Sequence, residues 1–157
     1  MIYILLGTNL GNKLSNLSNA IEKLRSFSLF INRTSSIYKT AAWGNTNQDS
    51  FLNQVLEIET KIDPQELLKI CLSIEKVMGR IRNEKWEARI IDIDILFYND
   101  LTLTNKALII PHEFMHKRRF TLKPMAELNP NLMHPVLKKT IRELLDNCED
   151  NLRVEKF

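Results

Sequence analysis

The chain has 157 residues and a formal net charge of +3, from 22 Lys and Arg against 19 Asp and Glu. This length suits one domain with its own core, residues 1–157, and is too short for two full domains. The composition, 44% hydrophobic and 26% charged, is typical of a globular protein. The small positive charge fits an anionic ligand but is below the level typical of nucleic-acid-binding proteins, so we expect no nucleic-acid partner.

Cysteine usage and hydropathy bear on the location of the protein. Cys71 and Cys148 lie far apart in helix-like patterns, which indicates free thiols rather than a disulfide framework or a zinc site. The first residues, MIYILLGTN, lack the basic segment of a signal peptide, and no apolar run approaches the twenty residues of a membrane span. We therefore expect a cytoplasmic protein without a membrane partner.

Strand and helix patterns alternate in the first part of the chain. Residues 2–7 form a short apolar run that predicts a buried strand. Over 12–27 the apolar residues recur every three or four positions, which predicts an amphipathic helix. The stretch 29–41, rich in Ile, Thr, Ser and Tyr, predicts one long strand, and 51–62 predicts a second strand after a polar loop.

A second helix has clear signals at both ends. Pro64 suits its first position, Asp63 its cap, and Gly79 its end. A charged loop leads to the stretch 88–100, ARIIDIDILFYND, whose β-branched run predicts another strand. Four prolines divide the rest of the chain into short pieces, of which 140–148 is the best predicted helix.

The order of these elements predicts an α+β fold. Strand, helix, two strands, helix and strand make a ferredoxin-like βαββαβ antiparallel sheet, with helices packed on one face and a C-terminal helical extension. The sequence contains no repeat, low-complexity segment or linker, so we expect a single domain.

Two acidic residues interrupt the most apolar strand. Asp92 and Asp94 are two apart, so they point to the same side, while Ile91, Ile93 and Ile95 point to the other and can enter the core. At about 6.5 Å the two carboxylates repel by roughly 2–3 kcal/mol at an effective dielectric of 20. They are either an ordinary solvated face or oxygen ligands for Mg²⁺, which takes a few carboxylates together with phosphate and water.

The loop before this strand is rich in cations. Arg80, Arg82, Lys85 and Arg89 lie within ten residues, with Trp86 among them. Such a run is often only a solvated surface. Next to two acids it also resembles a clamp in which metal and guanidinium groups neutralise a polyphosphate, since the guanidinium fork can bind two phosphate oxygens.

Segments along nearly the whole chain resemble the 6-hydroxymethyl-7,8-dihydropterin pyrophosphokinase family, in order. The central and final segments are the most specific. The segments are LLGTNLGNKLSNL (5–17), YKTAAWG (38–44), FLNQVLEIET (51–60), IEKVMGRIRNEKWEARIIDIDIL (74–96) and IPHEFMHKRRFTLKPMAELNP (110–130).

The resemblance implies an activity and its co-substrates. Such an enzyme transfers pyrophosphate from ATP to the hydroxymethyl group of 6-hydroxymethyl-7,8-dihydropterin, giving AMP and the pterin diphosphate in folate biosynthesis. Two Mg²⁺ ions bridge the phosphates of ATP. The family fold is the ferredoxin-like sheet predicted above, and we expect a monomer.

The resemblance also implies roles for individual residues. Arg80 and Arg89 match catalytic cations, and Asp92 and Asp94 match the metal ligands. The positions that match ATP-binding residues are Arg82, Lys85, Trp86, Ile95, His112 and Arg118. The positions that match pterin-binding residues are Thr40, Ala41, Trp43, Phe51, Asn53, Asp92 and Phe120.

Other interpretations remain for some of these residues and for the whole chain. Phe51 and Phe120 could be core residues, Asn53 a strand-edge amide and His112 a structural histidine. A ferredoxin-like sheet with basic loops could bind RNA, although the aromatic motif of that class is missing. A metal-dependent nucleotidyltransferase also uses paired aspartates, but it releases pyrophosphate from ATP rather than AMP.

Overall fold

The structure is a computed structural model that describes residues 1–41, 49–80 and 88–157. No helix in these ranges is long and apolar enough to cross a lipid bilayer. In chain order, the helices and strands are β1 (Ile2–Thr8), α1 (Lys13–Ser26), β2 (Phe30–Thr34), β3 (Tyr38–Thr40), β4 (Phe51–Glu59), α2 (Pro64–Val77), β5 (Asp92–Tyr98), β6 (Leu103–Thr104), β7 (Ile109–Ile110), a 3₁₀ turn (Met115–Lys117), α3 (Arg119–Leu128), α4 (Ile141–Asp146) and β8 (Val154–Lys156).

An antiparallel sheet forms the centre of the protein. Its strand order is β5-β1-β4-β3-β8, and β2 also pairs with β4. Each of these pairs is antiparallel. The predicted antiparallel sheet with helices packed on it is therefore confirmed.

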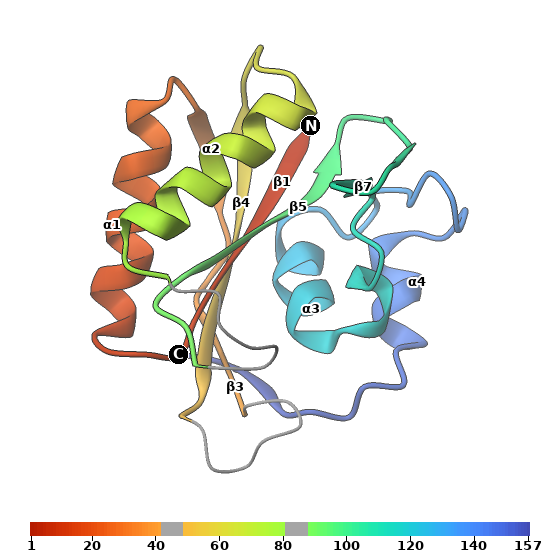
Figure 1. The fold of residues 1–157 in the computed structure, drawn as a ribbon. Helices are drawn as coiled ribbons and strands as arrows, with labels where there is room; N and C mark the ends of the chain where they lie inside the picture. Colours follow the sequence, from red (N-terminus) through yellow and green to blue (C-terminus); the bar gives the residue numbers. More distant parts are fainter. Residues whose placement is uncertain (42–48, 81–87) are drawn as a thin grey trace.

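Helices cover both faces of the sheet, as Figure 1 shows with α1 and α2 on one side and α3 and α4 on the other. The helices of the C-terminal part thus pack on the face that the first two helices leave uncovered. The core under α1 and α2, called the first core here, includes Ile4, Leu6, Leu17, Leu24, Leu56, Leu67, Ile74, Ile91, Ile93 and Ile95. The core under α3 and α4, the second core, includes Tyr3, Leu5, Val55, Phe97, Leu122, Met125, Ile141 and Leu144.

Strand β5 alternates between the two faces as predicted. Ile91, Ile93 and Ile95 are buried in the first core, and Asp92 and Asp94 face the opposite side of the sheet. The two carboxylates therefore lie on the face that carries α3.

The predicted long strand over 29–41 is wrong in detail, because it divides into β2 and β3 at Ser35. The Ser35 N–H donates to the carbonyl of Val55 at 2.8 Å. In return the Val55 N–H donates to the Ser35 hydroxyl at 3.0 Å, and the Ser35 carbonyl accepts from the Gln54 side chain at 2.9 Å. A serine hydroxyl thus replaces a backbone carbonyl in the ladder and interrupts the strand.

Of the C-terminal elements, only α4 was predicted from the sequence; α3 and β8 are the unpredicted ones that bear on the site. Helix α3 contains Pro124, which removes one intrahelical hydrogen bond, but its residues Leu122 and Met125 are fully buried in the second core. Strand β8 gives the end of the chain a structural role, because it pairs with β3. The predicted helix over 140–148 is confirmed as α4, which begins with a capping box between Thr140 and Glu143.

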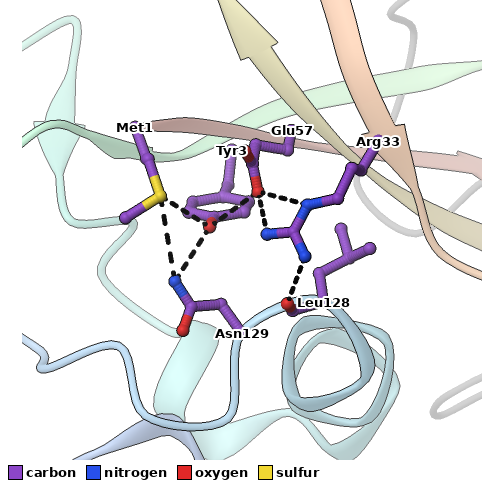
Figure 2. A network of polar contacts seen from close by, with 6 residues as sticks. All are labelled: Met1, Tyr3, Arg33, Glu57, Leu128 and Asn129. Atoms are coloured by element: carbon purple, nitrogen blue, oxygen red, sulfur yellow. Dashed lines mark hydrogen bonds and ion pairs between the residues drawn. The ribbon is translucent and has the colours of Figure 1, made fainter.

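A buried polar network fastens the end of α3 to the sheet (Figure 2). The Tyr3 hydroxyl donates to the Glu57 carboxylate at 3.1 Å and accepts from the Asn129 amide at 3.2 Å. The Arg33 guanidinium forms an ion pair with the same Glu57 oxygen and donates to the Leu128 carbonyl at 3.0 Å. Since the Glu57 side chain is only 9% exposed, these partners take the place of water around its carboxylate.

We expect Arg33→Gln to lower the free energy of unfolding by about 1–3 kcal/mol, because it leaves a largely buried carboxylate without its cation. The matched control is Arg25→Gln, since Arg25 pairs with Glu22 in an exposed i,i+3 geometry. The control should change the free energy of unfolding by less than about 0.5 kcal/mol. Urea unfolding followed by circular dichroism measures both variants, and equal losses would contradict the role given to the buried network.

Candidate active site

A cavity of about 440 Å³ opens where β1, β3, β4 and β5 meet the segment that leads into α3. It brings together many of the residues predicted from the resemblance, although they come from distant parts of the chain. The predicted residues that line it are Thr40, Ala41, Phe51, Asn53, Arg89, Asp92, Asp94, Arg118 and Phe120. Leu5, Gly7, Phe114 and Lys117 complete the lining among the residues described.

Gly7 forms part of the cavity lining in the middle of the sheet. It lies in register with Asn53 on one side and Asp92 on the other. A Cβ atom at this position would lie 3.2 Å from the Asn53 amide oxygen and 3.8 Å from the Asp92 Cβ. A glycine here keeps the space between the amide and the carboxylate open.

The amide of Asn53 is held in the wall of the cavity. Its Nδ2 donates to the Thr40 hydroxyl at 2.9 Å, and both residues are 3% exposed. Phe51, at the start of β4, and Phe120, in the first turn of α3, line the same cavity. The cavity therefore offers two aromatic rings and a fixed amide, which suits a flat heterocycle with polar edges.

On the other side of Gly7, Asp92 lies between two guanidinium groups. Arg80 pairs with its Oδ1 atom and Arg89 with its Oδ2 atom. Burial acts to raise the pKa of Asp92, but the two guanidinium charges outweigh it and hold that pKa below its usual value. Asp92 is consequently an ionised carboxylate at neutral pH.

Asp94 is in the opposite electrostatic situation. Burial, together with the negative charge of Asp92, raises its pKa to about 7. Within the described ranges, no hydrogen bond or ion pair reaches its carboxylate. An added cation at this position would relieve the cost of ionising Asp94.

Glu75 was missed by the sequence analysis and supports this arrangement from α2. Its side chain is 2% exposed. Its Oε1 atom accepts from the Ile93 N–H at 2.9 Å and pairs with Arg80 at 2.6 Å. Arg80 therefore bridges two carboxylates, Glu75 and Asp92, and its position is well defined. The only signal in the sequence was a glutamate next to the apolar face of the predicted helix.

Asn9 is a second missed residue, and it fixes the backbone of Arg89. It is 1% exposed, and its side-chain oxygen accepts from the Arg89 N–H at 2.8 Å. Its own N–H donates to the Arg89 carbonyl at 3.1 Å. These two bonds hold the backbone from which the Arg89 side chain reaches Asp92.

His112 lies beside the cavity without lining it. Its backbone N–H donates to the Leu96 carbonyl on β5 at 3.0 Å, and its Nδ1 atom accepts from the Phe114 N–H at 3.2 Å. Burial and the charge of Arg118 lower its pKa to about 4, so the ring is neutral at neutral pH. With Nδ1 as an acceptor, the proton of the neutral ring is on Nε2, which can donate to a ligand.

Some predicted residues are not placed in the cavity. Trp43, Arg82, Lys85 and Trp86 lie outside the described residues. The side chain of Ile95 is 4% exposed and packs in the first core, so a contact with a ligand would have to come from its backbone.

Comparison with known sequences identifies the family. The family model described as 7,8-dihydro-6-hydroxymethylpterin-pyrophosphokinase matches residues 3–130. A relative from Aquifex aeolicus (strain VF5), named 2-amino-4-hydroxy-6-hydroxymethyldihydropteridine pyrophosphokinase, is 44% identical over 142 residues, which cover 90% of this chain and 88% of the relative. A relative with the same name from Methylorubrum extorquens is 40% identical over 144 residues, which cover 91% and 90%.

Solved structures share the fold at low sequence identity. One, titled as HPPK-DHPS in complex with substrates, has a TM-score of 0.73 at 17% identity. Another, Plasmodium falciparum HPPK-DHPS wild type with pteroate, has a TM-score of 0.72 at 18% identity. Each match covers 92% of this chain but less than half of the solved chain, 42% and 43%. On the extent of the family match and the identity to these relatives, the chain belongs to the 7,8-dihydro-6-hydroxymethylpterin-pyrophosphokinase family.

Proposed function

We propose that the chain transfers pyrophosphate from ATP to the hydroxymethyl oxygen of 6-hydroxymethyl-7,8-dihydropterin, giving AMP and the pterin diphosphate in folate biosynthesis. Membership in the family and relatives named as pyrophosphokinases support this activity. The observation that carries it is the pairing, within one cavity, of a site for a flat ring with a site for phosphate charge.

At the acceptor end, the pterin would stack between Phe51 and Phe120. Asn53, held by Thr40, would read the polar edge of the ring, because an amide offers both a donor and an acceptor. Ala41, next to Thr40, also lines the cavity. The acceptor hydroxymethyl group would then point toward Asp92 and Asp94.

At the donor end, Asp92 and Asp94 fit a divalent metal ion. Two carboxylates on one strand face, one ionised and one costly to ionise alone, suit a hard cation with oxygen ligands. Among residues 1–41, 49–80 and 88–157, no group of three or more His, Cys, Asp or Glu side chains could hold a metal. Phosphate oxygens and water would complete the shell, as Mg²⁺ prefers. Two Mg²⁺ ions, when bound, would neutralise charge on the phosphate chain.

Arg80 and Arg89 would act on the phosphates directly. Both guanidinium groups on Asp92 are positioned by other residues, Arg80 by Glu75 and the Arg89 backbone by Asn9. They would stabilise charge on the phosphates during in-line attack of the hydroxymethyl oxygen on the β-phosphorus, which releases AMP. Positioning and charge neutralisation would supply most of the rate, without a covalent intermediate.

The remaining nucleotide contacts are assigned by the resemblance. His112 would donate from Nε2 to the phosphate or ribose, and Arg118 would bind phosphate from the cavity wall. The binding roles that the resemblance implies for the remaining residues stay predictions; these residues are Arg82, Lys85, Trp86, Trp43 and, through its backbone, Ile95.

We also propose a finer description of the whole chain. The order β5-β1-β4, followed by the β2 and β3 segments, supports a ferredoxin-like class with α3 and α4 as a C-terminal helical extension. A single domain over 1–157, a monomeric state and a cytoplasmic location stay predictions.

Product analysis tests the activity. With ATP, Mg²⁺ and 6-hydroxymethyl-7,8-dihydropterin, the purified chain should form AMP and pterin diphosphate in equal amounts, and chelation of Mg²⁺ should stop the reaction. Chromatographic separation of nucleotides measures this. Release of pyrophosphate instead of AMP would indicate a nucleotidyltransferase and contradict the proposal.

Asp94→Ala should lower kcat by roughly 10²- to 10⁴-fold, because it removes a ligand of a metal that stabilises transition-state charge by several kcal/mol. The matched control is Asp100→Ala, at an exposed turn directly after β5, which should keep wild-type turnover. Circular dichroism should be unchanged in both. If the Asp94 variant kept most of its turnover with Mg²⁺, the metal assignment would be wrong.

The pKa of Asp94 leads to a stability test that does not depend on activity. This pKa is raised from 3.8 to about 7 in the folded chain, so between these values the folded state binds more protons than the unfolded state. The contribution of Asp94 to stability therefore falls as pH rises from 4 to 7. Asp94→Asn should unfold at higher temperature than wild type at pH 8 without Mg²⁺, and at a similar temperature near pH 4.

Addition of Mg²⁺ completes the stability test. At pH 8 the ion should stabilise the wild-type chain more than Asp94→Asn, since it binds the ionised carboxylate of the folded state. Thermal unfolding with and without Mg²⁺ measures the difference. Equal stabilisation of the two proteins would contradict a metal site at Asp94.

A further inference from the structure

Arg118 lies near two aromatic rings at the wall of the cavity. Its Cζ atom is 5.6 Å from the centroid of the Phe114 ring and 5.8 Å from that of Phe120. Both distances are within the range of a cation–π interaction. Phe120 already has a proposed role in pterin stacking, whereas the resemblance gives Phe114 no role.

Phe114 also contacts the second side chain assigned to the nucleotide. Its backbone N–H donates to His112 Nδ1 at 3.2 Å, and its ring packs edge-on against the His112 ring with centroids 6.5 Å apart. The Phe114 ring lines the cavity and is 43% exposed, so a ligand in the cavity can reach it. One residue therefore touches both His112 and Arg118.

The two rings restrain the Arg118 side chain. Its backbone is fixed at the junction of the 3₁₀ turn and α3, where its N–H donates to the Met115 carbonyl at 3.3 Å. Across the part of the chain that the structure describes, no carboxylate forms an ion pair with its guanidinium. A long side chain without such a partner samples many rotamers, and flanking rings reduce that number before a ligand binds.

We propose that Phe114 is a positioning residue, which together with Phe120 holds the Arg118 guanidinium ready for the phosphate chain of the nucleotide. This inference rests on the proposed function, because it assumes that Arg118 binds ATP. Phe114 thus contributes to the affinity for the nucleotide, whereas Phe51, Asn53 and Phe120 determine the affinity for the pterin.

The test compares three variants. Phe114→Leu keeps an apolar side chain but removes the ring, and Phe114→Tyr restores the ring. Phe30→Leu is the control, since Phe30 is 69% exposed on β2 and does not line the cavity.

Phe114→Leu should raise the Kd of a non-hydrolysable ATP analogue with Mg²⁺, and the KM for ATP, by about 3- to 10-fold. The KM for the pterin should not change. Phe114→Tyr and the control should resemble wild type.

A double-mutant comparison decides whether Phe114 acts through Arg118. In an Arg118→Gln background, Phe114→Leu should cause no further rise in the Kd of the ATP analogue, because the cation that the ring holds is gone. An equal rise in both backgrounds, or no rise in the wild-type background, would overturn the inference.

The two proposals fail differently. AMP formation by the wild-type chain with an unchanged Kd for Phe114→Leu would overturn only the role of Phe114. A wild-type chain that binds the ATP analogue but forms no AMP would overturn the proposed function, and the Kd comparison would still decide the role of Phe114. A wild-type chain that binds no nucleotide would overturn both.

Discussion

The alternation of side chains along β5 is the constraint from which the site follows. Because the isoleucines of this strand enter the first core, the two aspartates between them must face the other side of the sheet. There the two carboxylates repel each other in a partly buried setting. Ion pairs with Arg80 and Arg89 neutralise the charge of Asp92. Burial, together with the negative charge of Asp92, raises the pKa of Asp94 to about 7.

Helices on both faces of the sheet contribute residues around strand β5. On the first face, α2 supplies Glu75, a buried acid that holds both the Ile93 N–H and Arg80. On the second face, α3 and the turn before it supply the cavity wall with Arg118 and Phe120. The buried network around Glu57 fastens the end of α3 to the sheet. It therefore helps to fix the cavity wall formed by α3 relative to strand β5.

Local pattern predicted the elements whose signals lie within a few residues. The N-cap and first position of α2, the alternation of β5 and the facing of Asp92 and Asp94 all appear as expected. The break at Ser35, the helix that tolerates Pro124 and the positioning roles of Glu75 and Asn9 were not predictable in this way. Each depends on a partner far away in the chain, or on burial in a core that only the folded sheet creates.

The pairing of β8 with β3 has a practical meaning for anyone who manipulates this protein. The register places Val154 opposite Thr40, whose hydroxyl holds the Asn53 amide of the cavity. Strand β8 therefore supports the part of the cavity wall that contains Thr40 and Asn53. Changes within residues 154–156 would therefore disturb the strand that carries Thr40, so labels and attached proteins are better placed at exposed positions away from β8.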